Sequence, residues 1–119
     1  MAAKAILRRM KDIDPICPPK HSNTDSFVLC NKATVGCEHI EFFCAEIHPG
    51  GEAEEDVHPS SEHGFFMISG VGKATVDGEE YIIEPGDCLY IPPGAKHGIK
   101  PIGEQTIRFA VFMAPPRQL

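Results

Sequence analysis

Short apolar runs separated by turn residues are the feature that most constrains the fold of this chain of 119 residues. Eleven glycines and eleven prolines interrupt the sequence, so that its apolar runs have the length of strands rather than of long helices. This pattern predicts an all-β domain, either a sandwich or a small barrel. The expected strands are residues 26–34, 39–47, 64–70, 72–76, 80–84, 87–92, 97–102 and 106–114.

The segments outside these strands carry weaker signals. Residues 2–13 form the only stretch with helical spacing, and residues 14–26 read as a turn-rich arm without a strand. Residues 52–56, "EAEED", are expected to form a solvated loop after a break at "PGG". By contrast, Asp77-Gly78 between two runs of β-formers predicts a tight hairpin, because both turn positions tolerate positive φ.

Length and charge narrow the classes of function. The length fits one domain, and a net charge of −6 argues against a surface for nucleic acid or an anionic membrane. No apolar run approaches the roughly 20 residues that span a bilayer, and we expect no signal peptide. Five cysteines, an odd number without a C-x-x-C pair, favour reduced thiols and a cytoplasmic location.

Metal-competent side chains gather just before the apolar run at residues 64–70. Asp56 and His58 are two residues apart, so that on a strand both would point to the same side. His63 follows after "PSSE", and His97 lies far along the chain after "PPGAK". Three imidazoles and one carboxylate form a set of ligands suited to a transition metal.

Two blocks of the sequence resemble the paired motifs of the cupin superfamily. The first block keeps the family's spacing of glycines and ligands, and the second does the same around its histidine. The positions of the first block are Gly50, Asp56, His58, His63 and Gly70, and those of the second are Gly86, Pro92, Gly94, His97 and Pro101. The resemblance covers about residues 40–113 and implies a double-stranded β-helix, the cupin jelly roll of two antiparallel sheets, in a single cupin domain over residues 1–119.

The ligand positions depart from the family's usual residues. Asp56 stands where the family has His, His63 where it usually has Glu, and Pro101 where the second block ends in Asn. The resemblance therefore implies a metal site of Asp56, His58, His63 and His97, with the carboxylate moved from the third position to the first. One divalent ion of Mn, Fe, Ni or Zn is expected there.

Two alternatives to this ligand set stay open. Asp is shorter than His, so Asp56 is a ligand or instead a neighbour of a three-histidine site. Glu62 competes with His63 as the third ligand, because strand parity points either Phe65 or Phe66 inward, and the sequence does not decide between them.

The family resemblance implies a metal-dependent enzyme that acts on a small oxygenated metabolite inside the barrel. Lyase, isomerase, decarboxylase and dioxygenase chemistries all fit, and the alternative is a non-catalytic cupin that binds a sugar or another small molecule. Asp56, Arg108 and Tyr90 are the candidate catalytic residues, with Arg108 able to hold a carboxylate. We expect a homodimer that pairs through the N-terminal arm, residues 1–26.

Overall fold

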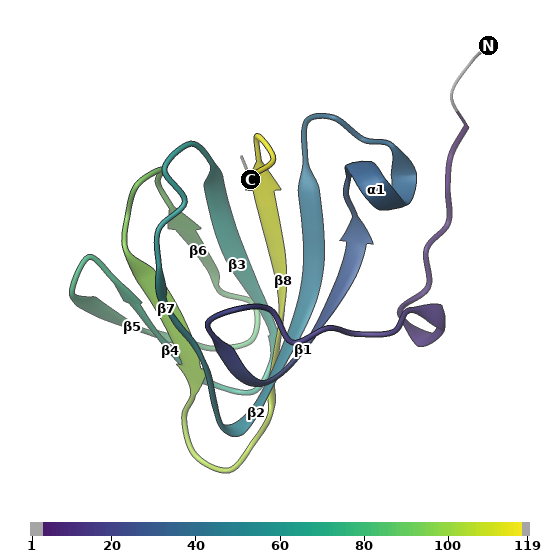
Figure 1. Ribbon diagram of the computed structural model, residues 1–119. Coiled ribbons are helices and arrows are strands. Elements are labelled where there is room, and N and C mark those ends of the chain that lie inside the picture. The colour runs from purple at the N-terminus through teal and green to yellow at the C-terminus, as the bar shows by residue number, and fades with distance from the viewer. Residues whose placement is uncertain (1–3, 118–119) are drawn as a thin grey trace.

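The computed structural model describes residues 4–117, and strands make up most of this part of the chain (Figure 1). Helical structure within these residues is limited to a 3-10 turn, η1 (Met10–Asp12), and one short helix, α1 (Lys32–Val35). The strands are β1 (His21–Cys30), β2 (Glu41–Asp56), β3 (Glu62–Ser69), β4 (Gly72–Val76), β5 (Glu79–Ile83), β6 (Cys88–Ile91), β7 (His97–Pro101) and β8 (Ile107–Ala114).

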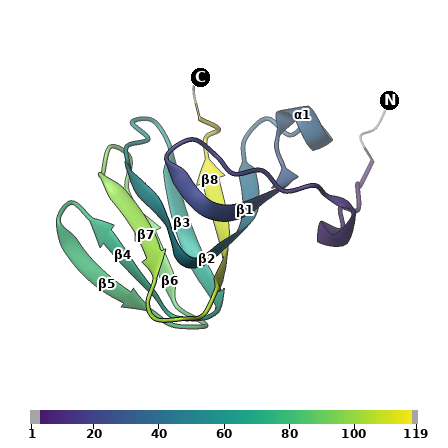
Figure 2. The same ribbon diagram turned by 60° about the horizontal axis from the view of Figure 1, so that its bottom comes forward.

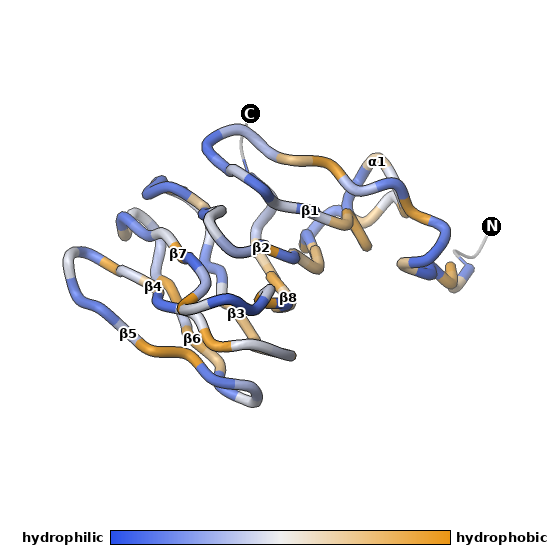
Figure 3. The backbone as a smooth tube through the Cα atoms, turned by 90° about the horizontal axis from the view of Figure 1, so that it is seen from below, coloured by the Kyte–Doolittle hydropathy of each residue, from blue (hydrophilic) through white to orange (hydrophobic). Residues whose placement is uncertain are grey.

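The strands join into one strongly curved antiparallel sheet. Its order is β5-β4-β7-β2-β8-β3-β6, and β1 pairs with β2 beside this path. The sheet curls into a nearly closed barrel, which confirms the predicted all-β jelly roll. Seen from below, β4, β5 and β6 lie on one side of the molecule, and β1 with α1 lies on the other (Figure 3).

Alternation along β3 decides which side chains fill the barrel. Phe65 and Met67 are buried, whereas Phe66 and Ile68 between and beyond them are each 44% exposed. Successive side chains of a strand point to opposite faces, so His63 shares the inner face with Phe65 and Met67. The buried apolar core contains Ala45, Ile47, Phe65, Met67, Ala74, Ile83, Ile91, Ala95, Ile99, Ile107 and Phe109.

The hairpin between β4 and β5 is confirmed. Asp77 and Gly78 connect the two strands with φ angles of 48° and 84°, and Val76 pairs with Glu79 across the turn. A two-residue turn with both φ angles positive matches the right-handed twist of the flanking strands.

The prediction of a break at "PGG" was wrong, because β2 continues through it and ends at Asp56. The strand changes partners here: Ile47 still pairs with β8, whereas Ala53 pairs with Ile99 of β7. Gly50 has a φ angle of 85°, and Gly51 packs so closely on the Ser22 carbonyl that a Cβ would collide with it. The glycines therefore bend one strand rather than end it.

The N-terminal segment also differs from the prediction. β1 begins at His21, inside the stretch that was expected to be an arm without a strand, because β2 offers it a partner. Most of residues 4–13 lack helical structure, apart from η1, since a short segment without a packed apolar face gains little from a helix. This segment extends away from the barrel (Figure 2).

Residues 1–3 of the expected arm and residues 118–119 lie outside the described residues. None of the helices described between residues 4 and 117 has the length and apolar character needed to cross a lipid bilayer.

Candidate metal centre

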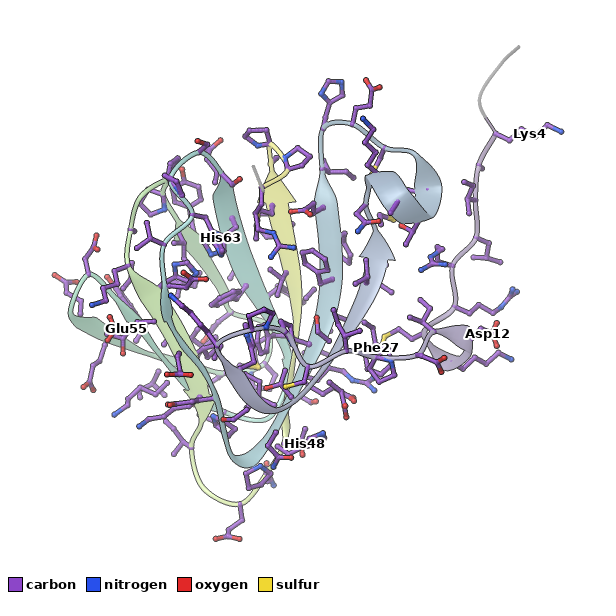
Figure 4. All side chains as sticks on the ribbon, in the orientation of Figure 1. Lys4, Asp12, Phe27, His48, Glu55 and His63 are labelled. Atoms are coloured by element: carbon purple, nitrogen blue, oxygen red, sulfur yellow. The ribbon has the colours of Figure 1, made fainter. Side chains whose placement is uncertain are left out.

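Three imidazoles converge inside the upper half of the barrel. His58 lies in the loop between β2 and β3, His63 on β3, and His97 at the start of β7. One ring nitrogen from each lies within 4.8 Å of the others, and His63 and His97 are 2% and 6% exposed. Figure 4 shows His63 in the barrel, whereas His48 lies at the opposite, lower end.

The two buried rings meet through their Nε2 atoms, which are 3.0 Å apart. The Nδ1–H group of His97 donates to the carbonyl of Ala95 at 3.0 Å, so Nε2 is the ring nitrogen of His97 that faces His63. A spacing of 3.0 Å is that of a hydrogen bond between the two rings, and it also brings both nitrogens close enough to contact one ion.

Burial keeps the imidazoles of His58 and His63 neutral. Desolvation, together with the charges of His97 and His58, lowers the pKa of His63 to about 3. Desolvation and the neighbouring His97 also lower the pKa of His58. Neutral imidazoles are the form that binds metals, and Nδ1 of His63 is buried without a hydrogen-bond partner among the described residues. The donors present thus fit a divalent transition metal.

Asp56 lies beside this cluster but is not part of it. It pairs with His97 in the β2–β7 ladder, and its Oδ1 accepts from Lys20 Nζ at 3.3 Å and from the Val57 N–H at 2.8 Å. Burial raises the pKa of Asp56, but these two hydrogen bonds outweigh it and hold the pKa below the usual value. The carboxylate is therefore ionised, with Oδ2 free of these two contacts.

Glu62 points away from the three imidazoles, as strand alternation requires next to an inward His63. It is exposed and accepts a hydrogen bond of 2.6 Å from the hydroxyl of Tyr90, which is 55% exposed on β6. Arg108 on β8 is exposed as well and forms an ion pair of 2.7 Å with Glu46. Neither of the candidate catalytic residues Tyr90 and Arg108 lines the cavity described next.

A cavity of about 550 Å³ opens onto the three histidines. Its volume lies in the range of pockets that hold small molecules. Its walls are mostly apolar, with several polar residues among them. The apolar wall includes Val28, Phe43, Phe65, Ile99, Phe109, Val111 and Met113, and the polar lining includes Thr24, Ser26, Asp56, His58, Ser61, His63, His97 and Arg117.

Arg117 is a cavity residue that sequence reasoning missed. The segment "APPRQL" reads from the sequence as a loose polar end, yet contacts of Pro115 and Arg117 hold its described part, residues 114–117, against the barrel. The buried hydroxyl of Ser61 donates to the Pro115 carbonyl at 2.7 Å, and Arg117 forms an ion pair of 3.0 Å with Glu41. The available signal was the acidic Glu41 at the start of an apolar strand, a residue that needs a cationic partner when it is largely buried.

The sequence model of the cupin domain family matches residues 43–113, which span all strands from β3 to β7, most of β8 and the larger part of β2. The chain belongs to the cupin domain family. The match includes His58, His63 and His97 and confirms the family resemblance of the two sequence blocks.

Three similar proteins place this cupin among its relatives. It is 26% identical over 107 residues, 90% of this chain and 70% of the relative, to polyketide synthase CurC of Streptomyces cyaneus. It superposes with a TM-score of 0.84 and 22% identity on the polyketide cyclase RemF of Streptomyces resistomycificus, covering 98% of this chain and 83% of that one. A predicted oxalate decarboxylase of Thermotoga maritima gives a TM-score of 0.82 and 17% identity, covering 93% and 100%. The two structural likenesses support the fold.

Proposed function

We propose that this cupin is a metal-dependent enzyme that acts on a small oxygenated metabolite inside the barrel. His58, His63 and His97 would hold one divalent ion of Mn, Fe, Ni or Zn. The observation that carries the proposal is the convergence of their ring nitrogens within 4.8 Å on the wall of a cavity of about 550 Å³. Metal binding is common among cupins, which supports the same assignment.

The bound metal would supply Lewis-acid polarisation of a carbonyl or enol oxygen. The chain's own residues provide the remaining functions of the site. The apolar wall around Phe65 and Phe109 excludes water and positions the carbon skeleton of the substrate. Asp56 is ionised and borders the cavity, so its Oδ2, which is free of the contacts with Lys20 and Val57, can accept a proton as a base of low strength.

The cavity favours a substrate with an apolar, ring-forming body and a few oxygens. Phe43, Phe65 and Phe109 offer flat apolar contacts, and Phe65 and Phe109 pack edge to face with their centroids 5.1 Å apart. A sugar, with hydroxyls on every side, would leave many of its polar groups unpaired against these walls. The similarity to a polyketide synthase protein and a polyketide cyclase agrees with a poly-carbonyl or aromatic substrate.

We also propose that the enzyme works as a homodimer in the cytoplasm. The N-terminal arm exposes apolar side chains, with Ile6 at 55% and Leu7 at 73%, and the outer face of the sheet exposes Phe66 and Phe112 at 44% and 40%. Covering such surfaces with a second subunit removes them from water. The cysteines are free thiols, which agrees with a reducing compartment.

A turnover experiment separates the enzyme from the non-catalytic alternative. Purified protein is incubated with aromatic poly-β-ketones and with small dicarboxylates, before and after metal removal and after re-addition of Mn²⁺, Fe²⁺, Ni²⁺ or Zn²⁺. We expect conversion of a carbonyl-rich compound that stops on stripping and returns with one of the metals. Binding without conversion under every metal condition would favour the non-catalytic alternative, and conversion that persists after stripping would contradict metal dependence.

A further inference from the structure

Arg117 is the sole lysine or arginine, among residues 4–117, that lines the cavity. The sequence offered Arg108 as the residue to hold a substrate carboxylate, but Arg108 lies on the exposed side of β8 with Glu46. Arg117 follows the last strand, and its backbone and side chain are both tied to Glu41 on β2. A fixed cation therefore stands on the wall of an otherwise mostly apolar cavity.

The contact with Glu41 positions the guanidinium without using all of its donors. Oε2 of Glu41 accepts from Nε at 3.0 Å and from the backbone N–H of Arg117 at 3.2 Å, and Oε1 accepts from Nη2 at 3.5 Å. A guanidinium carries five N–H groups. Nη1 and the second hydrogen of Nη2 are not engaged by other described residues, so one edge stays free for a second acceptor.

The guanidinium of Arg117 packs against a residue of the apolar wall. Its central carbon lies 5.2 Å from the centroid of the Phe43 ring, and Phe43 itself lines the cavity. A flat apolar ligand against Phe43 would thus bring an attached oxygen toward Arg117. Guanidinium groups hold carboxylates through paired, charge-assisted hydrogen bonds, and stacking on a ring fixes the plane in which they do so.

We propose that Arg117 determines substrate specificity by binding an oxyanion, a carboxylate or enolate, at one end of a flat apolar substrate. The histidine cluster and Arg117 then address two oxygenated groups of one substrate in the same cavity. The inference rests on the proposed function for the identity of this cavity as the substrate site. It adds the substrate class: an aromatic or ring-forming compound that carries an acidic oxygen in addition to the group at the histidines.

Binding of a matched pair of probes tests this assignment. 2-Naphthoate carries the oxyanion, and 2-naphthamide is a neutral compound of nearly the same shape. Each is titrated calorimetrically into the Zn²⁺-loaded protein and into metal-stripped protein. The variants are Arg117→Gln and, as a matched control that removes an Arg–Glu ion pair outside the cavity, Arg108→Gln.

We expect wild-type protein to prefer the naphthoate, with and without Zn²⁺. Arg117→Gln should weaken naphthoate binding by about 10- to 100-fold, the effect of losing charge-assisted hydrogen bonds, and change naphthamide binding by less than about threefold. Arg108→Gln should leave both affinities unchanged. Retained naphthamide binding in Arg117→Gln shows that the cavity is intact.

The proposal would be overturned by no preference for naphthoate in the wild type, by an unchanged naphthoate affinity in Arg117→Gln, or by an equal loss in Arg108→Gln. A preference seen only with Zn²⁺, and insensitive to Arg117, assigns the oxyanion to the metal and also overturns it. Failure of the proposed metal site appears separately, as a protein that does not retain Zn²⁺ but still binds naphthoate through Arg117.

Discussion

The Nε2 atoms of His63 and His97 lie 3.0 Å apart, although 34 residues separate the two histidines. Their strands, β3 and β7, are not neighbours in the sheet, since β2 and β8 lie between them. The two rings therefore meet across the interior of the barrel. The backbone N–H of Gly94, in the loop before His97, donates to the His58 carbonyl at 3.0 Å. This bond holds the loop that carries His58 close to the loop that leads into His97.

Separate substitutions of His63 and Glu62, the two candidates for the third ligand, test whether His63 points toward the metal site. His63→Ala should abolish stoichiometric metal binding, because it removes a buried imidazole that contacts His97. Glu62→Gln should leave metal content unchanged, since Glu62 bonds to Tyr90 on the outer face. Both are read by elemental analysis of the purified variants, and loss of metal in Glu62→Gln alone would restore Glu62 as the ligand.

Asp56→Asn distinguishes a neighbour of the site from a ligand. Lys20 and Val57 occupy one oxygen of Asp56, so the protein should still hold about one metal per chain. The affinity, measured by chelator competition, should fall by about 10-fold, the lower end of the cost of losing a partner outside the ligand set, because the variant removes only a nearby negative charge. Lys20→Gln, which removes the partner cation, serves as the matched control. Loss of all metal in Asp56→Asn would make Asp56 a ligand.

The sequence predicted much of this site and fold because strand spacing follows from local residue patterns. The regular breaks indicated a sandwich or a small barrel, and the resemblance to the two cupin motifs implied the jelly roll and a site shared by the histidines. The contact of Lys20 with Asp56 was not accessible, since it joins residues 36 positions apart through the path of β1. Whether His63 or Glu62 points inward depended on which set of alternating side chains of β3 faces the barrel interior. The burial of Phe65 in the folded barrel shows that it is the set containing His63. Arg117 was missed because its fixed position depends on Glu41, 76 residues earlier.

Gly64→Ala should destabilise the barrel next to the histidine cluster. A Cβ at Gly64 would lie 2.5 Å from Cζ of Phe112 and 2.9 Å from the Leu89 carbonyl oxygen. Crowding of this kind costs about 1–3 kcal/mol in the free energy of unfolding, measured by denaturant titration. In a Phe112→Ala background the cost should be smaller, because the ring is gone. An equal cost in both backgrounds would contradict the predicted clash with Phe112.

The metal-stripped protein should lose stability as the pH falls from about 6.5 toward 3. The pKa of His63 is about 3 in the folded state, below its ordinary value of 6.5, so the unfolded chain takes up the proton first. The contribution of neutral His63 to the free energy of unfolding is fully present above pH 6.5 and is lost as the pH falls from 6.5 to about 3. Denaturant titrations at several pH values should give a steeper loss for the wild type than for His63→Gln, which cannot titrate there. Equal slopes would show that His63 is protonated similarly in both states.

The most direct test of the account is the metal content of protein expressed and purified without added metal or an affinity tag. Elemental analysis should find about one divalent transition metal per chain in the wild type. His97→Ala should hold none, because it removes a buried imidazole from the three-nitrogen cluster. His39→Ala, which removes an exposed histidine outside the cluster, should retain the wild-type value. A wild-type protein free of metal and unable to take it up, or full occupancy in His97→Ala, would contradict the proposed centre.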